Sequence, residues 1–139
     1  MAVTITQVHP DKLSTRRSKH DGSILYSQVV EVTGSGRMIF VAGQVARDAA
    51  GNNVGKGDMR AQIAQVGENI KDALEAVGAS LSDIVRTTTY VTDIDEYFKH
   101  ADVRMRYFGH STPTSTTVEV RRLASPEHLV EIEAFAVTN

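Results

Sequence analysis

The clearest hydrophobic pattern in the chain predicts a helix from Met59 to Val77. Within this range apolar residues recur mostly three or four positions apart, which is the spacing of one helical face. Asp58 is suited to cap the first turn, and Gly78 to follow the last one. The apolar positions of this face are Met59, Ile63, Val66, Ile70, Ala73, Leu74 and Val77.

A second helix is predicted from about Ile94 to Phe108. Asp93, followed three positions later by Glu96, resembles a capping box, and Gly109 is suited to end the helix. The stripe expected to face the core consists of Phe98, Ala101, Met105 and Phe108.

The remaining patterned segments are short and rich in β-branched residues, which predicts strands. These segments are Ala2–Val8, Ile24–Val32, Met38–Val45, Ile84–Thr92, Ser115–Leu123 and Leu129–Val137. The sequence TGSGR between the second and third segments is typical of a hairpin, so these two strands are expected to pair antiparallel. The element order predicts an α+β fold in which two helices cover one face of a mixed sheet.

The last predicted strand alternates most cleanly. Val130, Ile132, Ala134 and Ala136 fall on one face, and Glu131, Glu133, Phe135 and Val137 fall on the other. The two carboxylates are then about 6.6 Å apart along the strand. Because apolar residues share this acidic face, and the helices cover only one side of the sheet, we expect a closed symmetric oligomer to cover it.

Composition narrows the function classes. The 139 residues are expected to form a single domain, 1–139, and the net charge of −2 favours neither a nucleic acid nor a membrane surface as a partner. There is no cysteine, no secretory signal pattern and no apolar run near the ~20 residues of a membrane span. A soluble, cytoplasmic protein is therefore expected.

Known catalytic motifs are absent from the sequence. The five histidines are scattered without metal-ligand spacing, and neither a GxSxG nor a phosphate-loop sequence occurs. We therefore expect no metal site.

Three positions still suggest a binding site. Gly43 interrupts a strong strand, which indicates either a plain bulge or the close approach of a ligand or another backbone. Tyr26 is either a core aromatic or part of a site rim. Glu131 is either a general base in a sheltered cleft, or a carboxylate at a subunit seam paired with Arg86, Arg121 or Arg122.

Four stretches in combination resemble the Rid (reactive intermediate deaminase) family, also called YjgF, over roughly Tyr26 to Val137. They are FVAGQVA, AQIAQVGENIKDALEAVGASLSDIVRTTTYVTD, PTSTTVEV and LVEIEAFAV. The resemblance implies the fold of trimeric chorismate mutase, with binding clefts between the subunits of a homotrimer. It also implies hydrolysis of imines and enamines to ammonia and a keto acid, without metal or organic cofactor.

The resemblance also implies roles for individual residues. Tyr26 matches the family's cleft tyrosine, Gly43 the glycine beside the ligand with Ala42 next to it, and Glu131 the cleft glutamate that would orient water. Thr117 stands where some members have a small polar or thiol residue, and is expected to donate a hydrogen bond to the ligand.

One departure concerns substrate binding. Two positions after the motif's Pro113, the well-characterised deaminases have an arginine that grips the substrate carboxylate; here the residue is Ser115, which can offer only a hydroxyl. Arg121, on the same strand face, is about 20 Å away, whereas Arg104 and Arg106 on the second helix are candidate replacements.

Three functions remain open at this point. The first is a cofactor-free imine or enamine deaminase with altered substrate. The second is a trimer that binds a small molecule without catalysis, which the Ser115 departure favours. The third is RNA cleavage, which has been attached to this family, and which the net negative charge and the lack of paired histidines disfavour.

Overall fold

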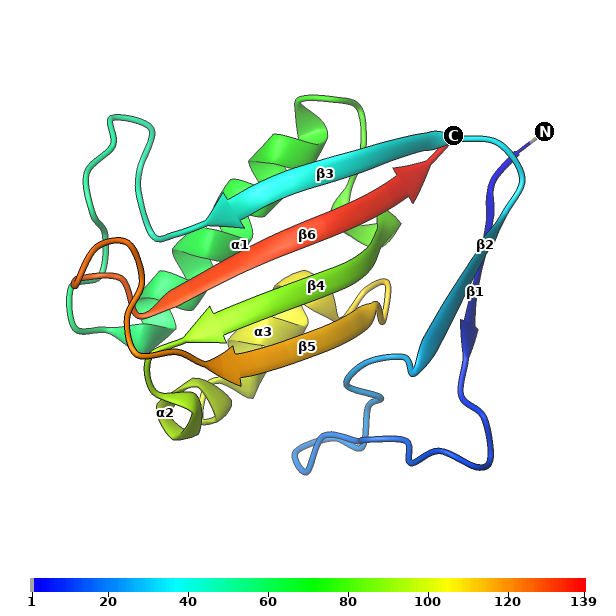
Figure 1. The fold of residues 1–139 in the computed structure, drawn as a ribbon, viewed down its shortest axis with the longest axis horizontal. Helices are drawn as coiled ribbons and strands as arrows, with labels where there is room; N and C mark the ends of the chain where they lie inside the picture. Colours follow the sequence, from blue (N-terminus) through cyan, green and yellow to red (C-terminus); the bar gives the residue numbers. More distant parts are fainter. Residues whose placement is uncertain (1) are drawn as a thin grey trace.

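The core of the protein is a four-stranded mixed sheet with helices packed behind it (Figure 1). The computed structural model describes residues 2–139. The strands follow the order β3-β6-β4-β5, with β6 antiparallel to both neighbours and β4 parallel to β5. Their bounds are β3 Arg37–Gln44, β4 Ile84–Val91, β5 Thr114–Glu119 and β6 Val130–Thr138. The α+β class, with helices on one face of a mixed sheet, is thus confirmed.

Helix α1 (Met59–Glu75) packs its predicted apolar stripe on the sheet except for Val77, which lies beyond the helix and is 46% exposed. The Asp58 side chain accepts a hydrogen bond from the Ala61 backbone N–H at 3.0 Å, which confirms the N-cap. The helix ends two residues before the predicted Val77. Gly78 has φ of 75°, and the Ala79 N–H bonds to the Leu74 carbonyl at 2.9 Å, which closes the last turn.

The second predicted helix is broken into α2 (Ile94–Phe98) and α3 (Ala101–Phe108). At the break, Lys99 and His100 donate backbone hydrogen bonds three residues back instead of four, which tightens the turn. The predicted stripe was wrong at Phe98, which is 57% exposed, while Tyr97 is buried. Ala101 and Met105 are only partly buried, and the buried residues of α3 are Val103, Arg104, Tyr107 and Phe108. Phe108 is buried as predicted.

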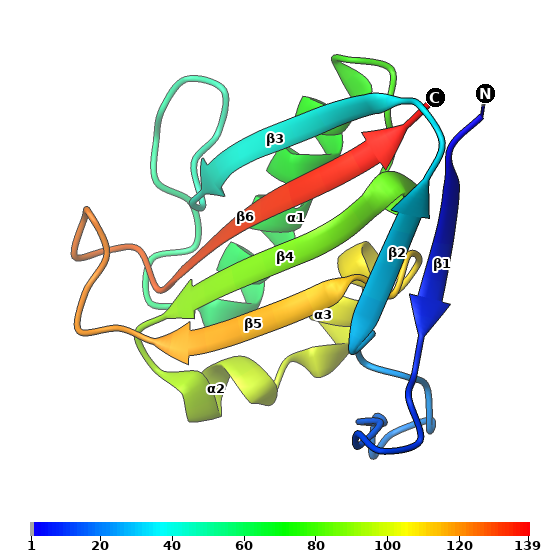
Figure 2. The same cartoon turned by 45° about the vertical axis from the view of Figure 1, so that its right-hand side comes forward.

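The predicted pairing of the second and third strands is wrong. Strand β2 (Val29–Thr33) pairs with β1 (Thr4–Val8) in a separate two-stranded ribbon, whereas β3 pairs with β6. Figures 1 and 2 show this ribbon as an arm beside the main sheet. Gly34 has φ of 90°, and a side chain at Gly36 would overlap Val3 and the Thr138 carbonyl. The glycine-rich link is therefore a tight corner between two sheets rather than a hairpin.

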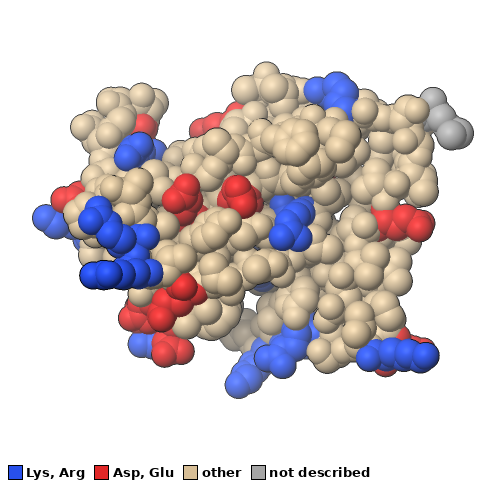
Figure 3. All heavy atoms as spheres, viewed as in Figure 1, with Lys and Arg blue, Asp and Glu red and all other residues tan. Residues whose placement is uncertain are grey.

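The two faces of the sheet differ as the alternation of β6 predicts. Val130, Ile132, Ala134 and Ala136 are buried beneath the helices. The opposite face, called here the open face, carries Glu131, Glu133 and Phe135 of β6 and Phe40 of β3. Figure 3 shows this face as mostly uncharged, with a few acidic and basic side chains near its middle.

The short helix η1 (Leu81–Asp83) joins α1 to β4. None of the helices within residues 2–139 is long and apolar enough to cross a membrane.

Candidate functional site

On the open face, the Glu131 carboxylate lies directly against Gly43. The register of β3 with β6 shifts between Val41 and Gln44, so Gly43 sits in a bulge. A Cβ atom at Gly43 would overlap the Glu131 carboxyl group. The predicted bulge at Gly43 is therefore confirmed, and the group that approaches this glycine closely is a side chain, not a ligand or another backbone.

The two carboxylates of β6 are in different situations. The Tyr90 hydroxyl donates a hydrogen bond to Glu133 at 3.1 Å, and this bond is the main reason why the pKa of Tyr90 is raised above its usual value. Within residues 2–139, the carboxylate of the half-buried Glu131 has no hydrogen bond or ion pair, so a pairing with Arg86, Arg121 or Arg122 is not formed within the chain. Glu131 is thus the carboxylate available for other partners.

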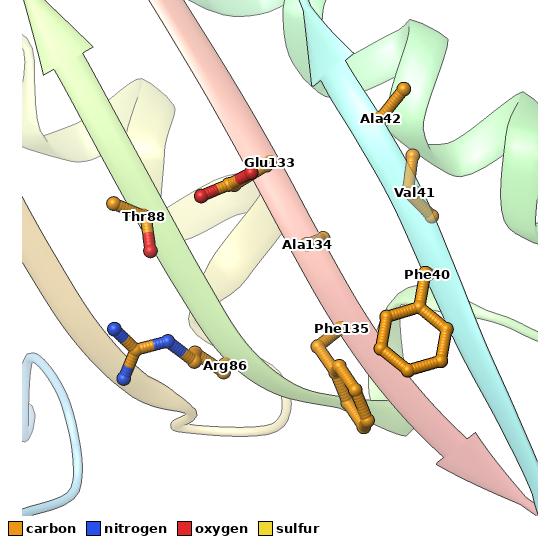
Figure 4. Close-up of a pocket in the computed structure, with 8 residues that line it drawn as sticks. All are labelled: Phe40, Val41, Ala42, Arg86, Thr88, Glu133, Ala134 and Phe135. Atoms are coloured by element: carbon orange, nitrogen blue, oxygen red, sulfur yellow. The ribbon is translucent and has the colours of Figure 1, made fainter.

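A shallow cavity of about 480 Å³, lined in part by Glu133, lies on the open face (Figure 4). The Phe40 and Phe135 rings meet edge to face at one end, with centroids 4.4 Å apart. Arg86 and Glu133 extend over the other end, and Ala42 forms part of the wall. Of the predicted ligand-binding residues, only Ala42 lines this cavity.

A second cavity, of about 460 Å³, lies at the outer edge of the sheet against α2 and α3. We call it the helix-side pocket; it is lined by Ser14, Arg16, Leu25, Tyr26, Tyr97, Phe98, Ala101, Arg104, Ser115 and Thr117. Three predicted site residues, Tyr26, Ser115 and Thr117, therefore do come together. Tyr26 is held there because the Ser27 backbone N–H bonds to the Pro113 carbonyl at 3.1 Å, just before β5.

An arginine occupies this pocket although β5 does not supply one. The Arg104 side chain is only 8% exposed, and its Nη2 donates a hydrogen bond to Ser115 Oγ at 3.3 Å. Arg106, the other candidate replacement, is exposed and does not line the pocket. The side chain of Tyr97, which the sequence analysis had not identified, lies in the same wall.

The predicted site residues fall into two groups on opposite faces of the sheet. Ser115 and Thr117 pair with Thr87 and Thr89, whose side chains are buried beneath the helices. Glu131 pairs with Tyr90 on the open face. Because β5 and β6 are also two strands apart, roughly 10 Å at ~4.8 Å per strand, the fold of the single chain does not bring Glu131 to the helix-side pocket.

His128 precedes β6 and fixes the loops at this end of the sheet. It is 1% exposed, and its Nε2 lies 2.9 Å from Asn53 Oδ1. Burial lowers the pKa of His128, with a smaller effect of Arg47 in the same direction, so the ring is held neutral. Among residues 2–139, no group of three or more histidine or carboxylate side chains is arranged to hold a metal ion.

Comparison with known proteins places this arrangement in a family. The protein-family model described as endoribonuclease L-PSP matches residues 19–138. The chain belongs to this family, which is the Rid (YjgF) family. A crystal structure of a Rid-family protein of unknown function from Yersinia pestis is 33% identical, with a TM-score of 0.79 over 96% of this chain and 98% of that one.

Curated relatives in the family carry two kinds of name. A RutC family protein of Pyrococcus abyssi is 44% identical over 80% of this chain and 84% of its own length. A 2-iminobutanoate/2-iminopropanoate deaminase of Bos taurus is 33% identical over 81% of this chain and 79% of its own. The Rid resemblance seen in the sequence is thus confirmed, and the family includes proteins named as imine deaminases.

Proposed function

We propose that this Rid-family protein is a cofactor-free hydrolase that deaminates a small imine or enamine in clefts between the subunits of a homotrimer. The observation that carries the proposal is the Glu131 carboxylate, which has no partner among residues 2–139 of its own protomer and lies against the Gly43 bulge on the open face. The proposal is also supported by relatives that are named as imine deaminases, such as the Bos taurus protein.

The chemistry requires only a positioned base and water. In the protonated imine the carbon is electrophilic, so a water oxygen adds to it while Glu131 accepts the proton that the water loses. The former C=N π electrons move to nitrogen, which gives a tetrahedral amino alcohol. Protonated Glu131 then returns its proton to the amino nitrogen, an electron pair on the hydroxyl oxygen forms the carbonyl as the C–N bond breaks, and the hydroxyl proton passes through Glu131 to the departing ammonia, which leaves as ammonium. An enamine enters the same sequence once its β-carbon is protonated.

The proposal includes the trimer because the predicted site residues lie in two groups that a single chain does not bring together. Glu131 and Gly43 lie on the open face, whereas Tyr26, Ser115 and Thr117 line the helix-side pocket behind it. A neighbouring protomer packed on the open face would place its own helix-side pocket beside Glu131. The exposed apolar side chains of that face, Met38 at 65% and Phe40 at 73%, favour such a contact.

The activity test is ammonia release from freshly generated 2-aminoacrylate. We expect the wild-type protein to accelerate the release and Glu131→Gln to lower kcat by about 10²- to 10⁴-fold, the range for loss of a general base. Glu133→Gln is the matched control, since it removes a carboxylate two residues along the same face that is already bonded to Tyr90. Equal activity in the wild type and Glu131→Gln would remove Glu131 from the mechanism.

A second function has one observation in its favour. Ser115 stands where the family's deaminases have their carboxylate-binding arginine, which favours a trimer that binds a ligand without turnover. Such a protein would show ligand-dependent melting across a panel of imines and keto acids, but no ammonia release.

RNA cleavage, the activity in the family model's description, is disfavoured by the net charge of −2. RNA degradation that survives in Glu131→Gln would indicate a contaminant, whereas degradation abolished by that change would support the activity.

A further inference from the structure

The helix-side pocket contains a buried positive charge, that of Arg104, which has no negative partner among residues 2–139. Arg104 donates hydrogen bonds to the Leu25 carbonyl at 3.2 Å, to Met105 Sδ at 3.3 Å and to Ser115 Oγ at 3.3 Å. All three acceptors are neutral. Because burying an unpaired charge costs free energy, an anion that entered this pocket would relieve an existing imbalance.

The rest of the pocket wall also favours an anion. It contains a second arginine, Arg16, and no aspartate or glutamate among the described residues. The Tyr97 hydroxyl is buried and lies near Thr89 and Arg104, but within residues 2–139 it makes no hydrogen bond of standard geometry. Burial raises the pKa of Tyr97, so the hydroxyl keeps its proton and is available as a donor.

We propose that Arg104 and Tyr97 take over carboxylate binding from the strand arginine that this chain lacks. A guanidinium can grip both oxygens of a carboxylate as a planar fork, and the tyrosine hydroxyl can donate to one of them. Helix α3 would then supply the cation that β5 lacks. In this view Ser115 does not indicate that the subsite is lost. Its hydroxyl accepts a hydrogen bond from Arg104, the arginine that takes the place of the family's strand arginine.

The pocket also indicates what surrounds the carboxylate. Leu25, Phe98 and Ala101 form an apolar part of the wall. The cavity of about 460 Å³ exceeds the volume of a three- or four-carbon acid, so an apolar side group on the substrate can be accommodated. This inference rests on the proposed deaminase function, but it is tested by binding alone.

The test compares an acid with its neutral analogue. Calorimetric titration of the full-length protein with 2-oxobutanoate, the keto acid corresponding to 2-iminobutanoate, and with its methyl ester would measure the contribution of the carboxylate. We expect the wild type to prefer the acid at least tenfold and Arg104→Met to lose this preference, with Arg104→Lys in between. Tyr97→Phe removes only the buried hydroxyl, which makes no hydrogen bond of standard geometry within residues 2–139, so it should weaken acid binding with only a small change in melting temperature.

A rescue variant distinguishes binding from a structural role. Arg104→Met combined with Ser115→Arg returns the arginine to the strand position used by the family's deaminases, so preference for the acid should return. An arginine that only braces Leu25 would affect the acid and the ester equally. Equal affinities in the wild type, or unchanged selectivity in both Arg104→Met and Tyr97→Phe, would overturn the subsite, and ammonia release would still test the deaminase proposal separately.

Discussion

Gly43 and Glu131 depend on each other at the scale of single residues. The bulge places the Gly43 backbone under the carboxyl group of Glu131, and the missing side chain leaves the space that this carboxyl group occupies. The atoms that a new Cβ would meet belong to the end of a flexible side chain, not to the backbone. The carboxylate can therefore move aside, but it then leaves its position over the bulge.

Gly43→Ala should consequently separate stability from activity. We expect the free energy of unfolding to change by no more than about 0.5 kcal/mol, because the side chain that must move is partly exposed. Ammonia release from 2-aminoacrylate should fall at least tenfold, because a displaced base no longer orients water. In a Glu131→Ala background the same change should cause no further loss, and an additive loss would contradict the coupling.

How well the sequence predicted these residues depended on the type of element that holds them. Gly43 and Glu131 were identifiable because strand alternation fixes the face of each residue, and a glycine in a strong strand marks a bulge. Tyr97 was missed because the predicted stripe followed the most apolar residues, Phe98 and Met105, whereas the face that is buried contains the polar residues Tyr97 and Arg104.

At the scale of elements, helix α1 meets α3 (Ala101–Phe108) at a glycine. The Tyr107 ring lies so close to Gly67 that a Cβ there would overlap three of its ring carbons. Gly67 is buried in the middle of α1, where glycine is a poor helix former. Close packing of the two helices is the physical reason for a glycine at this position.

Gly67→Ala sets helix propensity against packing. The propensity gain is about 1 kcal/mol, whereas overpacking a well-filled contact costs typically about 1–3 kcal/mol. We expect packing to prevail, so that the midpoint of urea unfolding falls. The double variant Gly67→Ala with Tyr107→Leu should lose less stability than the sum of the two single changes. A Gly67→Ala variant that is more stable than the wild type would contradict the tight contact.

The paired strands show why topology was harder to predict than the elements themselves. All six strands exist near their predicted positions. The sequence TGSGR, however, was predicted to form a hairpin, whereas it forms the corner between β2 and β3. Glycines permit a hairpin and a corner equally well, and the choice depends on Thr138 and Val3, which are distant in sequence from Gly36. Such long-range contacts leave no local signal.

At the scale of the whole molecule, the open face exposes apolar side chains that the helices do not cover. Phe40 is 73% exposed although its ring packs on Phe135, and the surrounding surface is mostly uncharged (Figure 3). The proposed trimer would bury these rings and bring the helix-side pocket of one protomer beside Glu131 of another. Assembly and activity should then be lost together.

Phe40→Glu tests this dependence because it places a charge in the middle of the proposed contact while leaving the helix-covered core intact. We expect light scattering to show a shift from trimer to monomer, with the circular dichroism spectrum of the fold retained and ammonia release abolished, since neither half of the site is complete alone. Val77→Glu is the matched control: it puts the same charge at another exposed apolar residue, 46% exposed and next to the end of α1, away from the open face. It should leave both mass and activity unchanged. A wild-type mass other than a trimer, or a Phe40→Glu monomer that still releases ammonia at the wild-type rate, would show that the cleft does not form between protomers, because the exposed rings would then have no bearing on the chemistry at Glu131.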